Sequence, residues 1–188
     1  MTDHFALLGQ PRLPWLDPDQ VKEAFHRATL HAHPDVAHSS GDQFAQLNNA
    51  QQVLRDPKLR LQHLLTLAGE APARTAAIPR GVEELFPSVA ALMQQAAELA
   101  GKYESASNSL TRSVLKPQML QTQQSVRELL QLLIQRQKEA SARLQQLNAS
   151  WEANSAAVIP ELHELYLRFS YLSRWTAELR ERESQLQS

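Results

Sequence analysis

The chain contains no cysteine, so disulfide bonds, thiolate catalysis and thiolate metal ligation are excluded. Glycine is scarce, with five residues in 188, and aromatic residues make up only 6% of the sequence. Both values argue against a β-sandwich or β-barrel, which needs many turns and many strand-forming side chains. Glutamine, alanine, leucine, glutamate and arginine are abundant instead, and these residues favour helix. We therefore expect an all-α protein.

Neither sign of charge dominates, since the chain has 19 lysine and arginine residues and 20 aspartate and glutamate residues. This balance predicts no nucleic-acid partner and no attraction to an anionic membrane. No apolar run approaches the roughly 18 residues of a membrane span, and residues 1–8 lack the basic start and apolar core of a signal peptide. We expect a cytoplasmic protein. The motifs of hydrolases and the glycine loops that bind phosphate are absent, so we expect neither an enzyme nor a cofactor.

Start and stop signals divide the first 69 residues into helices. Asp17-Pro18 and Asp56-Pro57 each combine a capping aspartate with a proline at the first helical position. Pro34 ends the helix that Asp17 begins, and Gly69 suits the position just after a helix. Apolar side chains at helical spacing predict two antiparallel helices that bury one stripe each: Val21, Ala24, Phe25, Ala28 and Ala32 on one, and Phe44, Leu47, Ala50, Val53 and Leu54 on the other.

The pattern changes after a segment that has the composition of a linker. Residues 70–81 are rich in alanine and proline and have no periodicity. Beyond them three long amphipathic stretches predict an antiparallel three-helix bundle over residues 82–188, with a turn at Asn154-Ser155 and Pro160 opening the last helix. We thus expect domains at 1–69 and 82–188, joined by a linker at 70–81.

His33-Pro34-Asp35 forms a polar corner between the two antiparallel helices. Proline cannot extend the helix and fixes one backbone angle, while histidine and aspartate supply a donor and a charged acceptor. A rigid exposed corner of this kind suits protein docking, although it also reads as a helix stop beside two ordinary polar residues. His26, His31, His33 and His38 cluster in sequence, but no carboxylate spacing completes a familiar metal-ligand set. We therefore expect no metal.

Residues 4–69 resemble a J-domain, and the details resemble the HscB type, the co-chaperone of iron–sulfur cluster assembly. The opening is HFALLG, followed after a loop by LDPDQVKEAFHRATLHAHPD. The segment LNNAQQVLRDPKLRLQHLLTLAG is similar to the family's LNxAxxxLxxPxxRxxYLLxLxG. The last helix contains LRFSYLSRWTAEL, which also resembles the family's. This resemblance implies a J-domain joined to a C-terminal helical bundle in an L-shaped arrangement.

The resemblance also implies a chaperone partner. In J-domain proteins the HPD loop and the preceding helix dock on a DnaK/HscA-type chaperone and accelerate its hydrolysis of ATP. The residues at the corresponding positions of this chain are His33, Pro34, Asp35, Lys22, His26 and Arg27. Val36 directly follows the tripeptide, where the family often has a basic residue.

For the C-terminal domain, the resemblance implies a client, an iron–sulfur scaffold protein of the IscU type. The family binds it through the first and last helices of that domain, where this chain has Leu85, Phe86, Val89, Leu92 and Phe169. Each of these also fits a bundle core. The family's acidic stretch is missing from residues 88–97. Two alternatives stay open, a J-domain co-chaperone for a different client and a helical adaptor that does not stimulate an ATPase; exposed bundle faces also suggest a homodimer.

Overall fold

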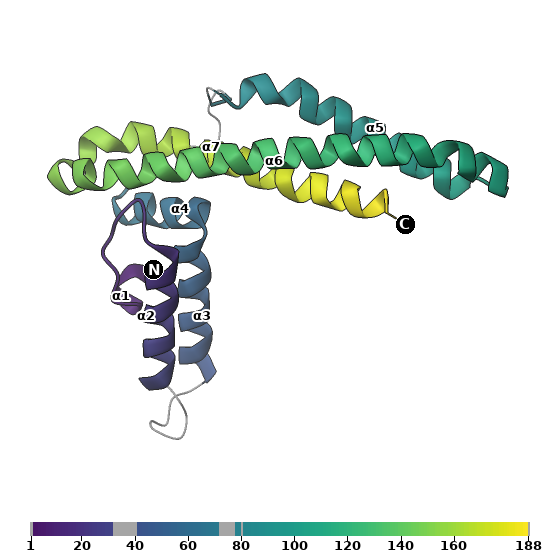
Figure 1. Ribbon diagram of the computed structural model, residues 1–188. Coiled ribbons are helices and arrows are strands. Elements are labelled where there is room, and N and C mark those ends of the chain that lie inside the picture. The colour runs from purple at the N-terminus through teal and green to yellow at the C-terminus, as the bar shows by residue number, and fades with distance from the viewer. Residues whose placement is uncertain (1, 32–40, 72–77, 80, 188) are drawn as a thin grey trace. The chain divides into compact units, whose positions relative to one another are not determined.

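The computed structural model describes residues 2–31, 41–71, 78–79 and 81–187 (Figure 1). Over these residues it contains helices and no strand, as expected of an all-α protein. The helices, in chain order, are α1 (His4–Leu7), α2 (Pro18–His31), α3 (Gly41–Arg55), α4 (Pro57–Leu67), the 3-10 turn η1 (Glu83–Leu85), α5 (Phe86–Ser105), α6 (Ser109–Ala153) and α7 (Ser155–Gln185).

The predicted capping residues lie at the boundaries of the N-terminal helices, as the sequence indicates. The Asp17 carboxylate accepts a hydrogen bond from the Asp19 N–H at 2.9 Å, and Asp56 accepts one from the Leu59 N–H at 3.0 Å. Gly69 follows α4 with a φ of 83°, a left-handed conformation that glycine adopts without a steric penalty. Helices α2 and α3 lie side by side (Figure 1), with α1 packed on α3, around a core of Phe5, Val21, Ala24, Leu47, Ala50 and Leu54.

Residues of the chain gather into two compact units, and the division between them runs through α6 and α7. One unit comprises Met1–Ala76 and Ala140–Leu167, and the other Ala77–Glu139 and Arg168–Ser188. The sequence predicts a different division, with boundaries at 69–70 and 81–82. That division places all of α6 and α7 in the domain of residues 82–188. Those boundaries stay a prediction, which the folding of an N-terminal fragment would test.

Whereas the predicted bundle comprises all of residues 82–188, the second unit consists of α5, the first part of α6 and the last part of α7. Its core is formed by apolar side chains that recur every three or four residues along each helix. Pro87 lies in the first turn of α5, where a missing N–H costs nothing. The most deeply buried members of this core are Val82, Val89, Ala96, Val126, Leu133, Leu172, Trp175 and Leu179.

The expectation that Pro160 opens the last helix is wrong. Helix α7 begins at Ser155, directly after Asn154, and Pro160 lies inside it. Proline cannot donate to the carbonyl four residues earlier, here that of Ala156, so one bond of the helix ladder is missing. The remaining bonds carry the helix through, and the apolar seam of Leu162, Leu165 and Phe169 continues without interruption.

Candidate functional site

The tripeptide His33-Pro34-Asp35 lies outside the residues that the structure describes. The structure does describe the helices that precede and follow it, α2 up to His31 and α3 from Gly41. The predicted hairpin on which such a loop would be carried is therefore present.

The predicted docking residues of α2 all lie on its exposed side. Lys22 and His26 are one helical turn apart, Arg27 follows, and all three are exposed. The opposite side of α2 buries Val21 and Ala24, so these three side chains are not needed for the core. A surface with two permanent positive charges and an imidazole can contact a partner without disturbing the packing of the hairpin.

Arg60 holds the base of this hairpin together, a role that sequence reasoning missed. Its side chain is only 3% exposed. Its Nε donates to the carbonyl of Pro14 at 2.9 Å, and its Nη1 donates to the carbonyl of Leu54 at 2.6 Å. Burial lowers the pKa of Arg60 to about 10 despite the nearby carboxylate of Asp56, so the guanidinium is charged at neutral pH. It joins the segment before α2 to the end of α3.

The five predicted client-binding residues differ in their accessibility. Leu85, Val89 and Phe169 are buried in the structure. Leu92 is half-buried and Phe86 is 45% exposed. The structure therefore leaves Phe86 and Leu92 as the accessible members of this set.

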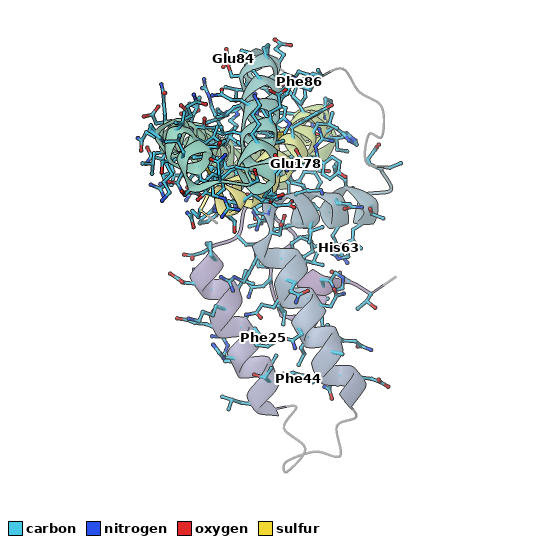
Figure 2. All side chains as sticks on the ribbon, turned by 90° about the vertical axis from the view of Figure 1, so that its right-hand side faces the viewer. Phe25, Phe44, His63, Glu84, Phe86 and Glu178 are labelled. Carbon is cyan, nitrogen blue, oxygen red and sulfur yellow. The ribbon has the colours of Figure 1, made fainter. Side chains whose placement is uncertain are left out.

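Phe86 lies at the start of α5, close to Glu84, as Figure 2 shows. Its ring meets that of Trp175 edge-on, with 6.1 Å between the ring centroids. Glu84 forms an ion pair with Arg136 of α6 at 2.9 Å. An aromatic ring held by a buried tryptophan and exposed on its other side is suited to contact with an apolar partner residue.

Residues 12–15 are tied to the end of α6 by hydrogen bonds that span more than 130 positions. Trp15 and Asn148 bond reciprocally, at 2.9 Å from the Trp15 N–H to the Asn148 Oδ1 and at 3.0 Å from the Asn148 amide to the Trp15 carbonyl. The indole N–H of Trp151 donates to the Arg12 carbonyl at 2.9 Å. These bonds bring part of α6 into the same compact unit as α2 and α3. No motif of the sequence indicates these partners.

Two further observations bear on function classes. The described residues contain no group of three histidine, cysteine, aspartate or glutamate side chains that could hold a metal ion; His33 and His38 of the histidine cluster lie outside the described part. Within that same part, no helix is long and apolar enough to cross a membrane.

Comparison with known proteins agrees with this arrangement. Residues 3–63 match the DnaJ domain family. The chain is 36% identical over 75 residues to the co-chaperone protein HscB homolog of Bordetella pertussis, an alignment that covers 36% of this chain and 44% of that protein. It is 37% identical over 60 residues to the chaperone protein DnaJ of Acaryochloris marina, covering 31% of this chain and 16% of that protein.

The whole-chain likeness is one of fold. Chaperone HscB from Vibrio cholerae superposes with a TM-score of 0.59 over 98% of this chain and 99% of that chain, at 20% sequence identity. Residues 3–63, which match the DnaJ domain and end inside α4, are thus part of a chain whose helical fold HscB also has. The predicted resemblance to J-domain co-chaperones of the HscB type is confirmed. The curated relatives match this chain over less than half of their length, so their partners and clients are proposals for it.

Proposed function

We propose that this chain is a co-chaperone that docks on a DnaK/HscA-type ATPase through His33, Pro34 and Asp35 and through the exposed side of α2. One observation carries the proposal: the stretch that matches the DnaJ domain, residues 3–63, includes the tripeptide. The exposure of Lys22, His26 and Arg27 on the preceding helix supports it. The chain itself then has no catalytic role, because the partner hydrolyses the ATP.

A single-turnover ATPase assay with the DnaK/HscA-type chaperone of the same organism tests this function. We expect the wild-type chain to accelerate hydrolysis and His33→Gln to abolish the acceleration while leaving the helical circular dichroism unchanged. His38→Gln makes the same chemical change five residues away and serves as the control, with acceleration retained. Equal stimulation by wild type and His33→Gln would refute docking through the tripeptide, and absence of stimulation by the wild type would favour the adaptor hypothesis.

For the client, we propose an iron–sulfur scaffold protein that contacts the accessible side chains Phe86 and Leu92 at the start of the second unit. Their exposure supports this choice, and Leu85, Val89 and Phe169 would then act by positioning α5 and α7. Residues 88–97 carry no acidic side chain, which favours an apolar contact and keeps a different client as the second candidate.

Calorimetry of the full chain with the IscU-like scaffold of the same organism distinguishes these candidates. We expect binding that Phe86→Ser weakens at least tenfold, the effect of losing a well-packed aromatic anchor. Leu132→Ser is the matched control, because Leu132 of α6 is similarly exposed at 39% but lies outside the predicted face. Absence of binding at high micromolar concentration would exclude the scaffold and leave another client.

Two further predictions have separate tests. Sedimentation of the full chain tests the predicted homodimer. Fractionation of the host cells tests the predicted cytoplasmic location.

A further inference from the structure

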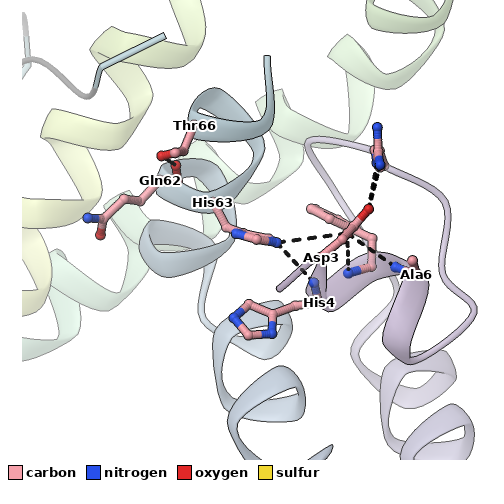
Figure 3. A network of polar contacts seen from close by, with 8 residues as sticks. Asp3, His4, Ala6, Gln62, His63 and Thr66 are labelled. Atoms are coloured by element: carbon pink, nitrogen blue, oxygen red, sulfur yellow. Dashed lines mark hydrogen bonds and ion pairs between the residues drawn. The ribbon is translucent and has the colours of Figure 1, made fainter. Parts of the chain in front are cut away.

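The first turn of α1 depends on a histidine from a distant helix. His63 of α4 is only 8% exposed, and its Nε2 accepts a hydrogen bond from the main-chain N–H of His4 at 3.0 Å (Figure 3). The next two N–H groups, of Phe5 and Ala6, donate to the Asp3 carboxylate at 2.9 and 3.2 Å. Because the first N–H groups of a helix have no acceptor within it, His63 completes the cap that Asp3 begins.

This hydrogen bond requires the neutral form of His63. A ring nitrogen accepts only while it keeps its lone pair, so the proton of the neutral ring lies on Nδ1. The protonated ring has an N–H at both nitrogens and would present its Nε2–H to the N–H of His4. Two donors then face each other, and the hydrogen bond that joins α1 to α4 is lost.

The charged groups around His63 do not compensate for that loss. Asp3 is the one carboxylate near the ring among the groups that affect it, with its Oδ1 3.9 Å from the His63 Nε2. That Oδ1 already accepts from two main-chain N–H groups, and the Asp3 Oδ2 accepts from the Arg12 Nε at 2.9 Å. The His4 ring, with its centroid 4.5 Å from that of His63, and the Arg12 guanidinium both oppose a positive charge. Burial, reinforced by these two groups, lowers the pKa of His63.

We propose that His63 and the main-chain N–H of His4 form a pH-sensitive latch, in which neutral His63 holds α1 on α4 and protonation of its Nε2 releases the first turn of α1. In the family pattern LNxAxxxLxxPxxRxxYLLxLxG, tyrosine stands at the position of His63. A tyrosine hydroxyl can also accept a hydrogen bond, but it does not titrate between pH 5 and 8.

Release of the latch reaches the contact with α6 through two hydrogen bonds. Asp3 binds the Arg12 side chain, and the Arg12 carbonyl accepts from the indole N–H of Trp151 at 2.9 Å. Loss of the first turn of α1 withdraws Asp3 from its place, so the Arg12 side chain loses its anchor. We therefore expect acid to loosen residues 10–13 together with α1, while the hairpin of α2 and α3 stays folded.

Amide hydrogen exchange of the isotope-labelled full chain between pH 7.5 and 5.5 tests the latch, with the His63 ring signals followed in the same samples. After correction for the intrinsic pH dependence of exchange, we expect the protection of the His4 N–H to fall at least about fivefold as the ring protonates, the factor that corresponds to one hydrogen bond. The indole N–H signal of Trp151 should shift over the same pH range.

Three variants separate the latch from other titrations. In His63→Gln and His63→Tyr an acceptor that does not titrate replaces the ring, so protection of the His4 N–H should not change with pH. In His4→Gln the main-chain donor and His63 both remain, so the pH dependence should persist. Unchanged protection while the wild-type His63 ring protonates would overturn the proposal, as would an undiminished pH dependence in His63→Gln. The ring titration of the wild type decides the question even if a variant does not fold.

Discussion

Asn148 forms two hydrogen bonds with the main chain of Trp15, accepting from its N–H and donating to its carbonyl. A side-chain amide has one acceptor and one donor group, and this geometry uses both at a single residue. The pair connects the segment before α2 to the far part of α6, within the compact unit of Met1–Ala76 and Ala140–Leu167. The segment between α1 and α2 is thus held by a side chain that lies 133 positions further along the chain.

The Asn148 contact predicts a measurable contribution to stability. Asn148→Ala leaves the Trp15 N–H and carbonyl without their partners, so we expect a loss of about 1–2 kcal/mol in the free energy of unfolding. Urea denaturation of the full chain measures it. Asn49→Ala, at an exposed position of α3, is the control and should change stability by less than about 0.5 kcal/mol. Equal effects of the two variants would contradict the assigned role.

The predicted domain boundary is tested by a fragment of residues 1–70. Helices α1 to α4 and their buried apolar core are all contained in it, so we expect a helical circular dichroism spectrum. The fragment lacks Asn148 and Trp151, however, and should therefore unfold at a lower urea concentration than the same helices do in the full chain. A coil spectrum would show that residues 140–167 are required for folding and would reject a boundary near residue 70.

Replacement of Arg60 by lysine should destabilise the folded chain. Its guanidinium donates from two nitrogens to carbonyls in different segments, whereas a lysine ammonium is a single point and cannot reproduce this fork. With the site buried, we expect Arg60→Lys to cost about 2–3 kcal/mol through an unpaired carbonyl and an imperfectly solvated charge. Thermal or urea unfolding measures the loss. Arg55→Lys on the exposed surface of α3 is the matched control, and a similar loss there would refute the argument.

The stability of the chain should decrease on mild acidification. Burial lowers the pKa of both His4 and His63 in the folded chain, although Asp3 opposes the shift. The unfolded chain therefore binds protons more readily, and the folded state has its full advantage above the ordinary histidine pKa of about 6.5. That advantage is lost as the pH falls through the lowered folded pKa values. Urea unfolding at several pH values between 5 and 8 should show this slope, and His63→Tyr should reduce it.

Much of the local structure could be predicted from the sequence because it depends on neighbours along the chain. The cap at Asp56 and the left-handed residue at Gly69 are found as expected, since hydrogen bonds between residues three or four apart decide them. Pro160 is the exception. A proline near the beginning of a helical pattern predicts the first turn of the helix, but α7 begins five residues earlier, at Ser155.

The candidate site was predictable only in part. The exposure of Lys22, His26 and Arg27 follows from the position of the apolar stripe on α2, and the structure agrees with it. Accessibility within the predicted client face did not follow, because every apolar residue at helical spacing fits a core equally well. Val89 belongs to the core that α5, α6 and α7 share, whereas Phe86 contacts Trp175 of α7 and stays 45% exposed.

By itself, the sequence determined the N-terminal helices, their caps and the position of the tripeptide between α2 and α3, because short-range hydrogen bonding and the geometry of proline and glycine act between near neighbours. Only the tertiary structure decided the roles of the polar residues. Arg60 reaches back 46 positions to Pro14, His63 reaches back 59 to His4, and Asn148 reaches back 133 to Trp15. No local pattern records such partners, since a buried donor or acceptor is satisfied by whatever group the fold brings within hydrogen-bonding distance.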